Sequence, residues 1–351
     1  MLAPNGESPR WERSKPMPSW RAMLLVTALL LAGEMAAIFY QGTKAVETSA
    51  SEESSTVVMV TPTPRPLPEN IYMGLPKGLA TVSVSFSAEE LWEGKLLFID
   101  SNHPVPSEAP APNTLSIAAA ANGQVAVRTV QTAVHPEMIE ALEKMFLQAR
   151  IDGVSNWVVW EGARSNAQQL ELQIERLRIH AMKHPLEEAA GLAAQQVPAP
   201  GCSEHQTPYV VDIRLADGWN STPDTRSLSA SKEGRYLIGN AWRYGFIHRY
   251  SKAIAPPYED EAYHFRYVGN AHSTLMHMLD MDLEEYLAFL HRAGNVSCYE
   301  AGELRYIVVC KKMEQQMIMK IPKGGTLEAS MDNLGYAVCV VSFPSAQKTA
   351  P

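Results

Sequence analysis

A histidine and an aspartate, His205 and Asp212, lie seven residues apart in the stretch SEHQTPYVVDI, residues 203–213. In one uninterrupted strand, residues seven apart point to opposite faces. Pro208 lies between them, lacks an N–H and forces Thr207 into extended backbone. We therefore expect a turn that carries His205, followed by a strand that carries Asp212. Such a turn lets the imidazole and the carboxylate converge, and both groups suit a zinc ion.

A second candidate pair is Glu261 and His264 in the tetrapeptide EAYH. On a strand these positions face opposite sides, so a bend is required if both act at one centre. Three protein ligands leave the fourth zinc position open for water, whose pKa the metal lowers, and a glutamate can take the proton. Taken singly, each signal is also compatible with an ordinary structural role, because an isolated histidine before a strand is more often structural and a buried aspartate can be a cap or a salt-bridge partner.

Longer segments around these residues resemble the VanY-type D-alanyl-D-alanine carboxypeptidases, a zinc peptidase family. PGCSEHQTPYVVDI resembles the zinc-binding segment of that family, with the pattern S-x-H-x-x-G-x-A-x-D. WEGARSNAQQLELQ resembles its upstream S-G-Y-R-S segment, and NAWRYGFIHRY and EAYHFRYVGNA resemble its two downstream segments. The matches occur in the order of the family and span roughly residues 102–290, about half of the chain.

The resemblance implies a role for individual residues. It implies three Zn²⁺ ligands, which are His205, Asp212 and His264. Glu261 matches the catalytic base and proton donor, and Arg164 matches the arginine that polarises the scissile carbonyl. Ser203 and Gln169 match substrate-contacting residues.

Several neighbours depart from the family pattern. Proline replaces glycine at Pro208, Ala163 replaces an aromatic residue, and Ala262 replaces a proline. The ligands and the base are retained, so the departures concern substrate preference more than the metal chemistry. Trp157 and Trp160 are expected to be core residues, and His272 and His277 to be structural or exposed.

The elements that position these residues alternate between helix and strand. Helices are expected over 136–152, 165–182, 236–244 and 283–290, and strands over 81–86, 156–160, 209–213, 246–250 and 262–268. Further strands are expected over 304–310, 316–321 and 336–343. The pattern predicts the α+β fold class and a small β-rich domain over 293–351. The resemblance implies that residues 78–292 form a zinc-peptidase-like core with an antiparallel sheet and flanking helices.

The N-terminal region predicts a membrane anchor. Residues 22–40 form a 19-residue apolar run interrupted only by Glu34, about 28 Å long as a helix. Basic residues precede it, which favours a cytoplasmic tail over 1–21 and an extracytoplasmic remainder. A cleaved signal peptide is the alternative. Residues 41–77 are rich in Ser, Thr, Glu and Pro and are expected to be a disordered tether.

Composition excludes other classes. The net charge of −8 gives no support for nucleic-acid binding, and no Rossmann or Walker glycine motif is present. The four cysteines form no CxxC pair. The resemblance, together with the predicted anchor, implies a single-pass membrane protein that hydrolyses the terminal D-Ala-D-Ala bond of peptidoglycan stem peptides. The alternatives are a degenerate member that binds wall peptides without cutting them and a peptidoglycan endopeptidase.

Overall fold

The computed structural model describes residues 66–105, 109, 111–216, 225–250 and 263–344. The predicted anchor over 22–40, most of the predicted tether and Glu261 lie outside these residues. Among the described residues, no helix is both long and apolar enough to cross a lipid bilayer.

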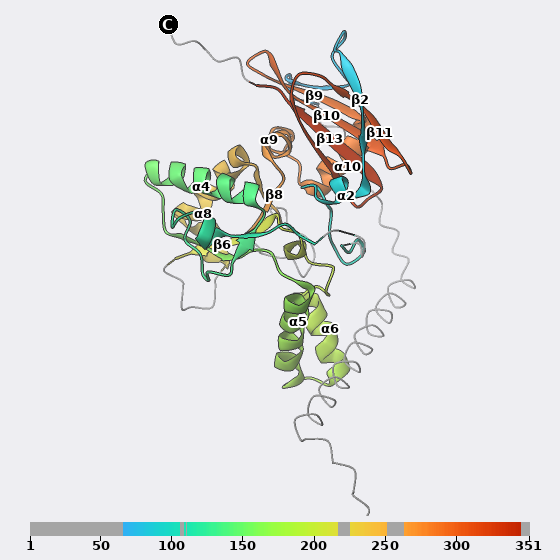
Figure 1. Ribbon diagram of the computed structural model, residues 1–351. Coiled ribbons are helices and arrows are strands. Elements are labelled where there is room, and N and C mark those ends of the chain that lie inside the picture. Colours follow the sequence, from blue (N-terminus) through green and yellow to red (C-terminus); the bar gives the residue numbers. More distant parts are fainter. Residues whose placement is uncertain (1–65, 106–108, 110, 217–224, 251–262, 345–351) are drawn as a thin grey trace, which may run out of the picture.

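The elements follow one another as a mixed α/β chain (Figure 1). The helices are α2 (Ala88–Trp92), α3 (Ile117–Ala120), α4 (Pro136–Ile151), α5 (Asn166–Ala181), α6 (Leu186–Gln196), α7 (Thr225–Ala230), α8 (Lys232–Asn240), α9 (Asn270–Leu279) and α10 (Leu283–Ala293), with the 3₁₀ turns η1 (Glu204–Gln206) and η2 (Ala241–Tyr244). The strands are β1 (Ile71–Met73), β2 (Thr81–Phe86), β3 (Leu115–Ser116), β4 (Ala133–Val134), β5 (Trp157–Glu161), β6 (Val210–Leu215), β7 (Phe246–His248), β8 (His264–Tyr267), β9 (Asn295–Glu300), β10 (Glu303–Lys312), β11 (Met317–Pro322), β12 (Thr326–Met331) and β13 (Tyr336–Ser342).

Local sequence signals explain where the main helices begin. Pro136 occupies the first turn of α4, where a missing N–H costs nothing. Ser165 and Gln168 form a capping box at the start of α5, and Asp282 and Glu285 form another at the start of α10. The helix expected over 236–244 is split into the end of α8 and the tighter turn η2. Helix α6 was not predicted.

A four-stranded antiparallel sheet with the order β5-β6-β8-β7 forms the centre of the first part of the molecule. One of its faces is covered by α4 and α8, whose apolar side chains share a core with alternate residues of the strands, among them Val211, Ile213 and Phe265. Because side chains alternate across a strand, the residues between them point to the opposite face. Asp212 and His264 therefore lie together on that second face.

A five-stranded antiparallel sheet with the order β1-β9-β10-β13-β12 forms the second part. Helices α9 and α10 share a core with β9, β10 and β13, and a short pair of strands, β2 and β11, packs its apolar residues with α2 and the same sheet in a further core. Figure 1 shows β2 and β11 beside this sheet and the α5–α6 hairpin projecting away from it.

These pairings differ from the predicted domain limits. Ile71 is buried and β1 pairs with β9, so ordered structure begins within the segment expected to be a tether. Strand β2, expected in the peptidase-like unit, pairs with β11 of the C-terminal part. Strand pairing joins residues more than 200 positions apart here, and hydrophobic periodicity contains no information about such partners. The C-terminal cysteines Cys298, Cys310 and Cys339 are free thiols.

Candidate metal centre

His205, Asp212 and His264 converge on one point, as the sequence predicted. The candidate ligand atoms of the three side chains all lie within 4.8 Å of one another, and all three residues are buried. His205 Nε2 lies 3.2 Å and His264 Nδ1 lies 3.0 Å from the same oxygen, Asp212 Oδ1. The turn η1 carries His205, and β6 pairs Asp212 directly with His264 of β8. The turn thus brings His205 close to Asp212, and the pairing of β6 with β8 brings His264 to the same place.

The outer ring nitrogens of both histidines have defined partners. His205 Nδ1 donates to the carbonyl oxygen of Gly162 at 2.8 Å, because a carbonyl can only accept. His264 Nε2 lies 3.1 Å from Glu204 Oε2 and donates to that carboxylate. These partners assign the protons to the outer nitrogens, so both inner nitrogens direct a lone pair toward the Asp212 carboxylate. Three lone-pair donors facing one point fit a divalent cation, and the nitrogen and oxygen set suits Zn²⁺.

Glu204 is the part of this site that the sequence did not reveal. Its carboxylate is buried and bonded by Arg249 Nε at 2.9 Å, while Arg266 Nη1 lies 3.7 Å away. Burial alone would raise the pKa of Glu204, but Arg249, His264 and Arg266 hold that pKa well below its usual range. Glu204 therefore stays an anionic acceptor for His264.

The charge network continues from Arg249 to helix α10. Arg249 donates two hydrogen bonds to Glu284, at 2.9 and 2.8 Å, in the bidentate arrangement typical of guanidinium and carboxylate. Glu204 and Arg249 are 45 residues apart, so no local motif joins them in the sequence. The only signal was a charged residue directly before a predicted ligand.

The carboxylate of Asp212 is held in its charged form as well. Burial would raise its pKa, but positive charge on the neighbouring rings of His205 and His264 holds that pKa far below the ordinary value, and a bound cation would supply such positive charge while the inner nitrogens keep their lone pairs. A metal ligand must be deprotonated to bind, and this environment keeps Asp212 ready to do so.

The other predicted site residues fall into three groups. Arg164 Nη2 donates to Ser203 Oγ at 3.3 Å, and the backbone N–H of Arg164 bonds the His205 carbonyl, so both side chains lie beside the cluster. Gln169 is fully buried and donates to the Pro198 carbonyl at 2.7 Å, which ties α5 to the chain after α6 rather than exposing the amide to a substrate. Glu261 lies outside the described residues.

The structure also places the two tryptophans and the two histidines whose surroundings were predicted from the sequence. Trp157 is a core residue, as expected. Trp160 is half-buried instead, because Trp157 and Val159 point into the core and the alternation of the strand turns Trp160 to the opposite face. His272 is buried and hydrogen-bonded to Tyr286, and His277 stacks on Trp242 with ring centroids 4.1 Å apart.

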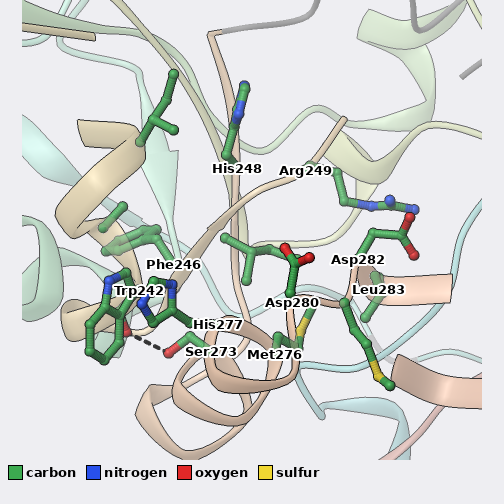
Figure 2. Close-up of a pocket in the computed structure, with 14 residues that line it drawn as sticks. Trp242, Phe246, His248, Arg249, Ser273, Met276, His277, Asp280, Asp282 and Leu283 are labelled. Atoms are coloured by element: carbon green, nitrogen blue, oxygen red, sulfur yellow. Dashed lines mark hydrogen bonds between the residues drawn. The ribbon is translucent and has the colours of Figure 1, made fainter. Parts of the chain in front are cut away.

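A separate cavity of about 240 Å³ lies between η2, β7 and the start of α10 (Figure 2). Trp242 and His277 stack at one side, and Ser273 donates to the Trp242 carbonyl at 2.7 Å. Arg249 lines the cavity as well as bonding Glu204, so it separates this space from the cluster. None of the three candidate metal ligands lines it.

The segment that carries the site matches a known family. The family model described as "VanY: D-alanyl-D-alanine carboxypeptidase" matches residues 131–270, which contain every predicted site residue. The predicted resemblance is thereby confirmed.

Individual relatives agree with the family match. The chain is 26% identical over 274 residues to a D-alanyl-D-alanine carboxypeptidase of Enterococcus faecium, a match that covers 77% of this chain and 82% of that protein. It is 30% identical over 198 residues to a D-alanyl-D-alanine carboxypeptidase of Enterococcus faecalis (strain ATCC 700802 / V583), over 56% of this chain and 66% of that protein.

A solved structure shares the fold. The crystal structure of the vancomycin resistance D,D-dipeptidase VanXYg, in complex with a D-Ala-D-Ala phosphinate analog, superposes with a TM-score of 0.60 at 21% identity. The match covers 75% of this chain and 99% of that chain. At this identity the likeness establishes the fold alone.

Proposed function

Because residues 131–270 form a domain of the VanY family, we propose that this chain is a zinc-dependent peptidase that removes the terminal D-alanine from peptides ending in D-Ala-D-Ala. One observation carries the proposal: three lone-pair donors of His205, Asp212 and His264 face one point while the other ring nitrogens are bound by Gly162 and Glu204. A zinc ion held there supplies Lewis acidity and an acidic bound water.

Residues near the cluster would stabilise the developing negative charge and transfer the proton. The side chain of Arg164 is 12% exposed, and its Nε has no hydrogen-bond partner among the described residues. Glu161 Oε1 lies 3.6 Å from this Nε. A fixed cation beside the cluster can stabilise negative charge that develops on the scissile carbonyl oxygen. Ser203 holds that guanidinium in place through Nη2. Glu261 takes the proton of the attacking water and passes it to the leaving amine, a role that the family resemblance supplies.

The test is release of D-alanine by the full, zinc-loaded chain from a pentapeptide ending in D-Ala-D-Ala and from the free dipeptide. Glu261→Gln removes the base and is expected to lower kcat by about 10²- to 10⁴-fold while zinc stays bound. The matched control is His277→Asn, which changes a histidine outside the cluster and should leave release intact. No release of D-alanine by the folded, zinc-loaded parent contradicts the proposal. New amino termini from whole peptidoglycan would then indicate an endopeptidase, and peptide binding without turnover a binding protein.

The proposal includes a location. A helix over residues 22–40 with basic residues before it would hold the domain on the outer face of the cell membrane, close to cell-wall peptides. This part rests on the sequence. Recovery of the full chain in the soluble fraction after cell lysis would contradict it.

A further inference from the structure

A second cationic group lies on the same sheet face as the candidate metal centre. Arg214 follows Asp212 by two residues on β6, so both side chains point away from the core that contains Val211 and Ile213. His205 precedes the strand, and Arg214 lies on the other side of Asp212 along the chain. Two residues of a strand span about 7 Å, so Arg214 lies within the length of a dipeptide from the cluster.

Aromatic rings hold the Arg214 guanidinium between them. Its Cζ lies 4.8 Å from the centroid of the Trp160 ring and 4.6 Å from that of Tyr263. A second arginine, Arg128, places its Cζ 4.2 Å from the centroid of the same Trp160 ring. Planar stacking fixes the orientation of a guanidinium while leaving its N–H donors at the edge available for hydrogen bonds.

Two donor atoms of Arg214 are unused within the described part of the chain. These atoms, Nε and Nη1, are shielded from solvent and have no hydrogen-bond partner among the described residues. Two carboxylates act on its charge, those of Asp212 and Glu161, but both have other contacts. Asp212 faces the two histidines of the cluster, and Glu161 lies 3.6 Å from Arg164. A buried donor without a partner destabilises the protein, and an incoming acceptor removes that cost.

We propose that Arg214, supported by Trp160, Tyr263 and Arg128, binds a carboxylate of the peptide substrate beside the metal centre. A guanidinium presents two parallel N–H donors that match the two oxygens of a carboxylate. Arg164 lies beside His205 and bonds Ser203, so it serves the reacting carbonyl and leaves the carboxylate to Arg214. The inference rests on the proposed function, because it assigns a group of the same substrate.

Two carboxylates of a peptide can supply the ligand: the C-terminal one, which is one residue beyond the cut bond, and an acidic side chain upstream of it. Four peptides ending in D-Ala-D-Ala separate these sources. The first pair has neutral residues and differs in the C-terminus, which is free in one peptide and amidated in the other. The second pair differs in one upstream residue, which is glutamate in one peptide and glutamine in the other. Their affinities are measured by calorimetry on the full, zinc-loaded Glu261→Gln chain, so that binding is read without turnover, and KM and kcat are measured on the chain with its natural Glu261.

Arg214→Gln is expected to weaken binding of the free-acid peptide by about 10- to 100-fold and to raise KM by a similar factor. The amidated peptide should bind the parent and the variant alike. Arg214→Lys keeps the positive charge but lacks the two parallel N–H donors, so its loss of affinity for the free-acid peptide should be smaller than that of Arg214→Gln. The matched control, Arg243→Gln, removes an arginine that stacks on Trp242 away from the cluster and should change neither value.

The outcomes separate the two proposals. A loss in Arg214→Gln limited to the glutamate-containing peptide assigns the upstream carboxylate. Carboxylate-dependent binding that requires Arg214, together with no turnover by the parent, supports this inference and contradicts the proposed hydrolysis. Turnover with equal affinities of the parent and Arg214→Gln for all four peptides overturns the inference and leaves the hydrolysis standing. Failure of every peptide to bind the folded protein overturns both.

Discussion

Replacing Glu204 by glutamine removes the charge of a side chain that touches no substrate in the proposed reaction. In the native protein this carboxylate accepts from His264 Nε2 at 3.1 Å and from Arg249 Nε at 2.9 Å, and its side chain is only 1% exposed. Glu204→Gln keeps the size and one carbonyl acceptor but loses the negative charge. We expect two separable effects, one on metal affinity and one on stability.

The effect on metal affinity follows from the imidazole. A carboxylate behind a ligating histidine fixes the ring and raises the basicity of its inner nitrogen, and loss of such a partner costs about 10- to 100-fold in affinity. The effect on stability follows from burial, because loss of the Glu204 charge removes a buried ion-pair partner of Arg249 and the nearby carboxylate of Arg266, at about 3 kcal/mol. Arg249 retains Glu284, so we take the lower end of the usual range.

The assay is competition for zinc against a chromophoric chelator, with urea unfolding of the metal-free protein measured in parallel. Glu284→Gln is the matched control: it removes the other carboxylate of Arg249, but Glu284 is 38% exposed and does not contact His264. Its loss should cost at most about 1 kcal/mol of stability and leave zinc affinity unchanged. The reasoning fails if Glu204→Gln binds zinc as tightly as the parent, or if both variants lose affinity equally.

Two further predictions concern the neighbourhood of the site. Burial, with a smaller contribution from Lys95, lowers the pKa of His272 to about 3, so protonation favours the unfolded chain and stability is lost as pH falls below about 6.5. The stability advantage of the parent over His272→Gln, measured by urea unfolding, should shrink by about 2 kcal/mol between pH 7 and pH 5, and a constant difference would contradict it. Gly162→Ala would place a Cβ 2.5 Å from the Ala133 carbonyl oxygen and shift the carbonyl that binds His205, so zinc affinity in the chelator assay should fall. Gly191→Ala, where the Cβ meets nothing within 4 Å, should leave zinc affinity unchanged.

Local patterns predicted many of the elements because their causes are local, whereas the full ligand set was implied by the family resemblance and meets through the pairing of β6 with β8. Helix α4 begins at Pro136 as its sequence indicated, and the turn before β6 brings His205 to Asp212 as Pro208 suggested. Helix α6 also had a signal, two glutamates in the first turn followed by alanines, which was overlooked. The position of Trp160 also had a signal, because Trp157 and Val159 lie in the core and alternation along β5 places residue 160 on the other face.

Contacts between distant segments could not be predicted, and they determine how the site is supported. The C-terminal strands were expected to form a small β-rich domain, and the sequence did not indicate its role. In the structure, Arg266, which approaches Glu204, donates to the carbonyl oxygens of Lys95 and Leu97 at 3.0 and 3.1 Å. Lys95 in turn bonds Glu328 of β12 at 2.6 Å.

Helix α10 makes a second connection between the site and the C-terminal sheet. It packs on that sheet and supplies Glu284 to Arg249. Both arginines around Glu204 are thus fixed by elements outside the four-stranded sheet. Because Glu204 orients His264, the C-terminal sheet acts on the geometry of the metal centre through the two buried guanidinium groups of Arg249 and Arg266.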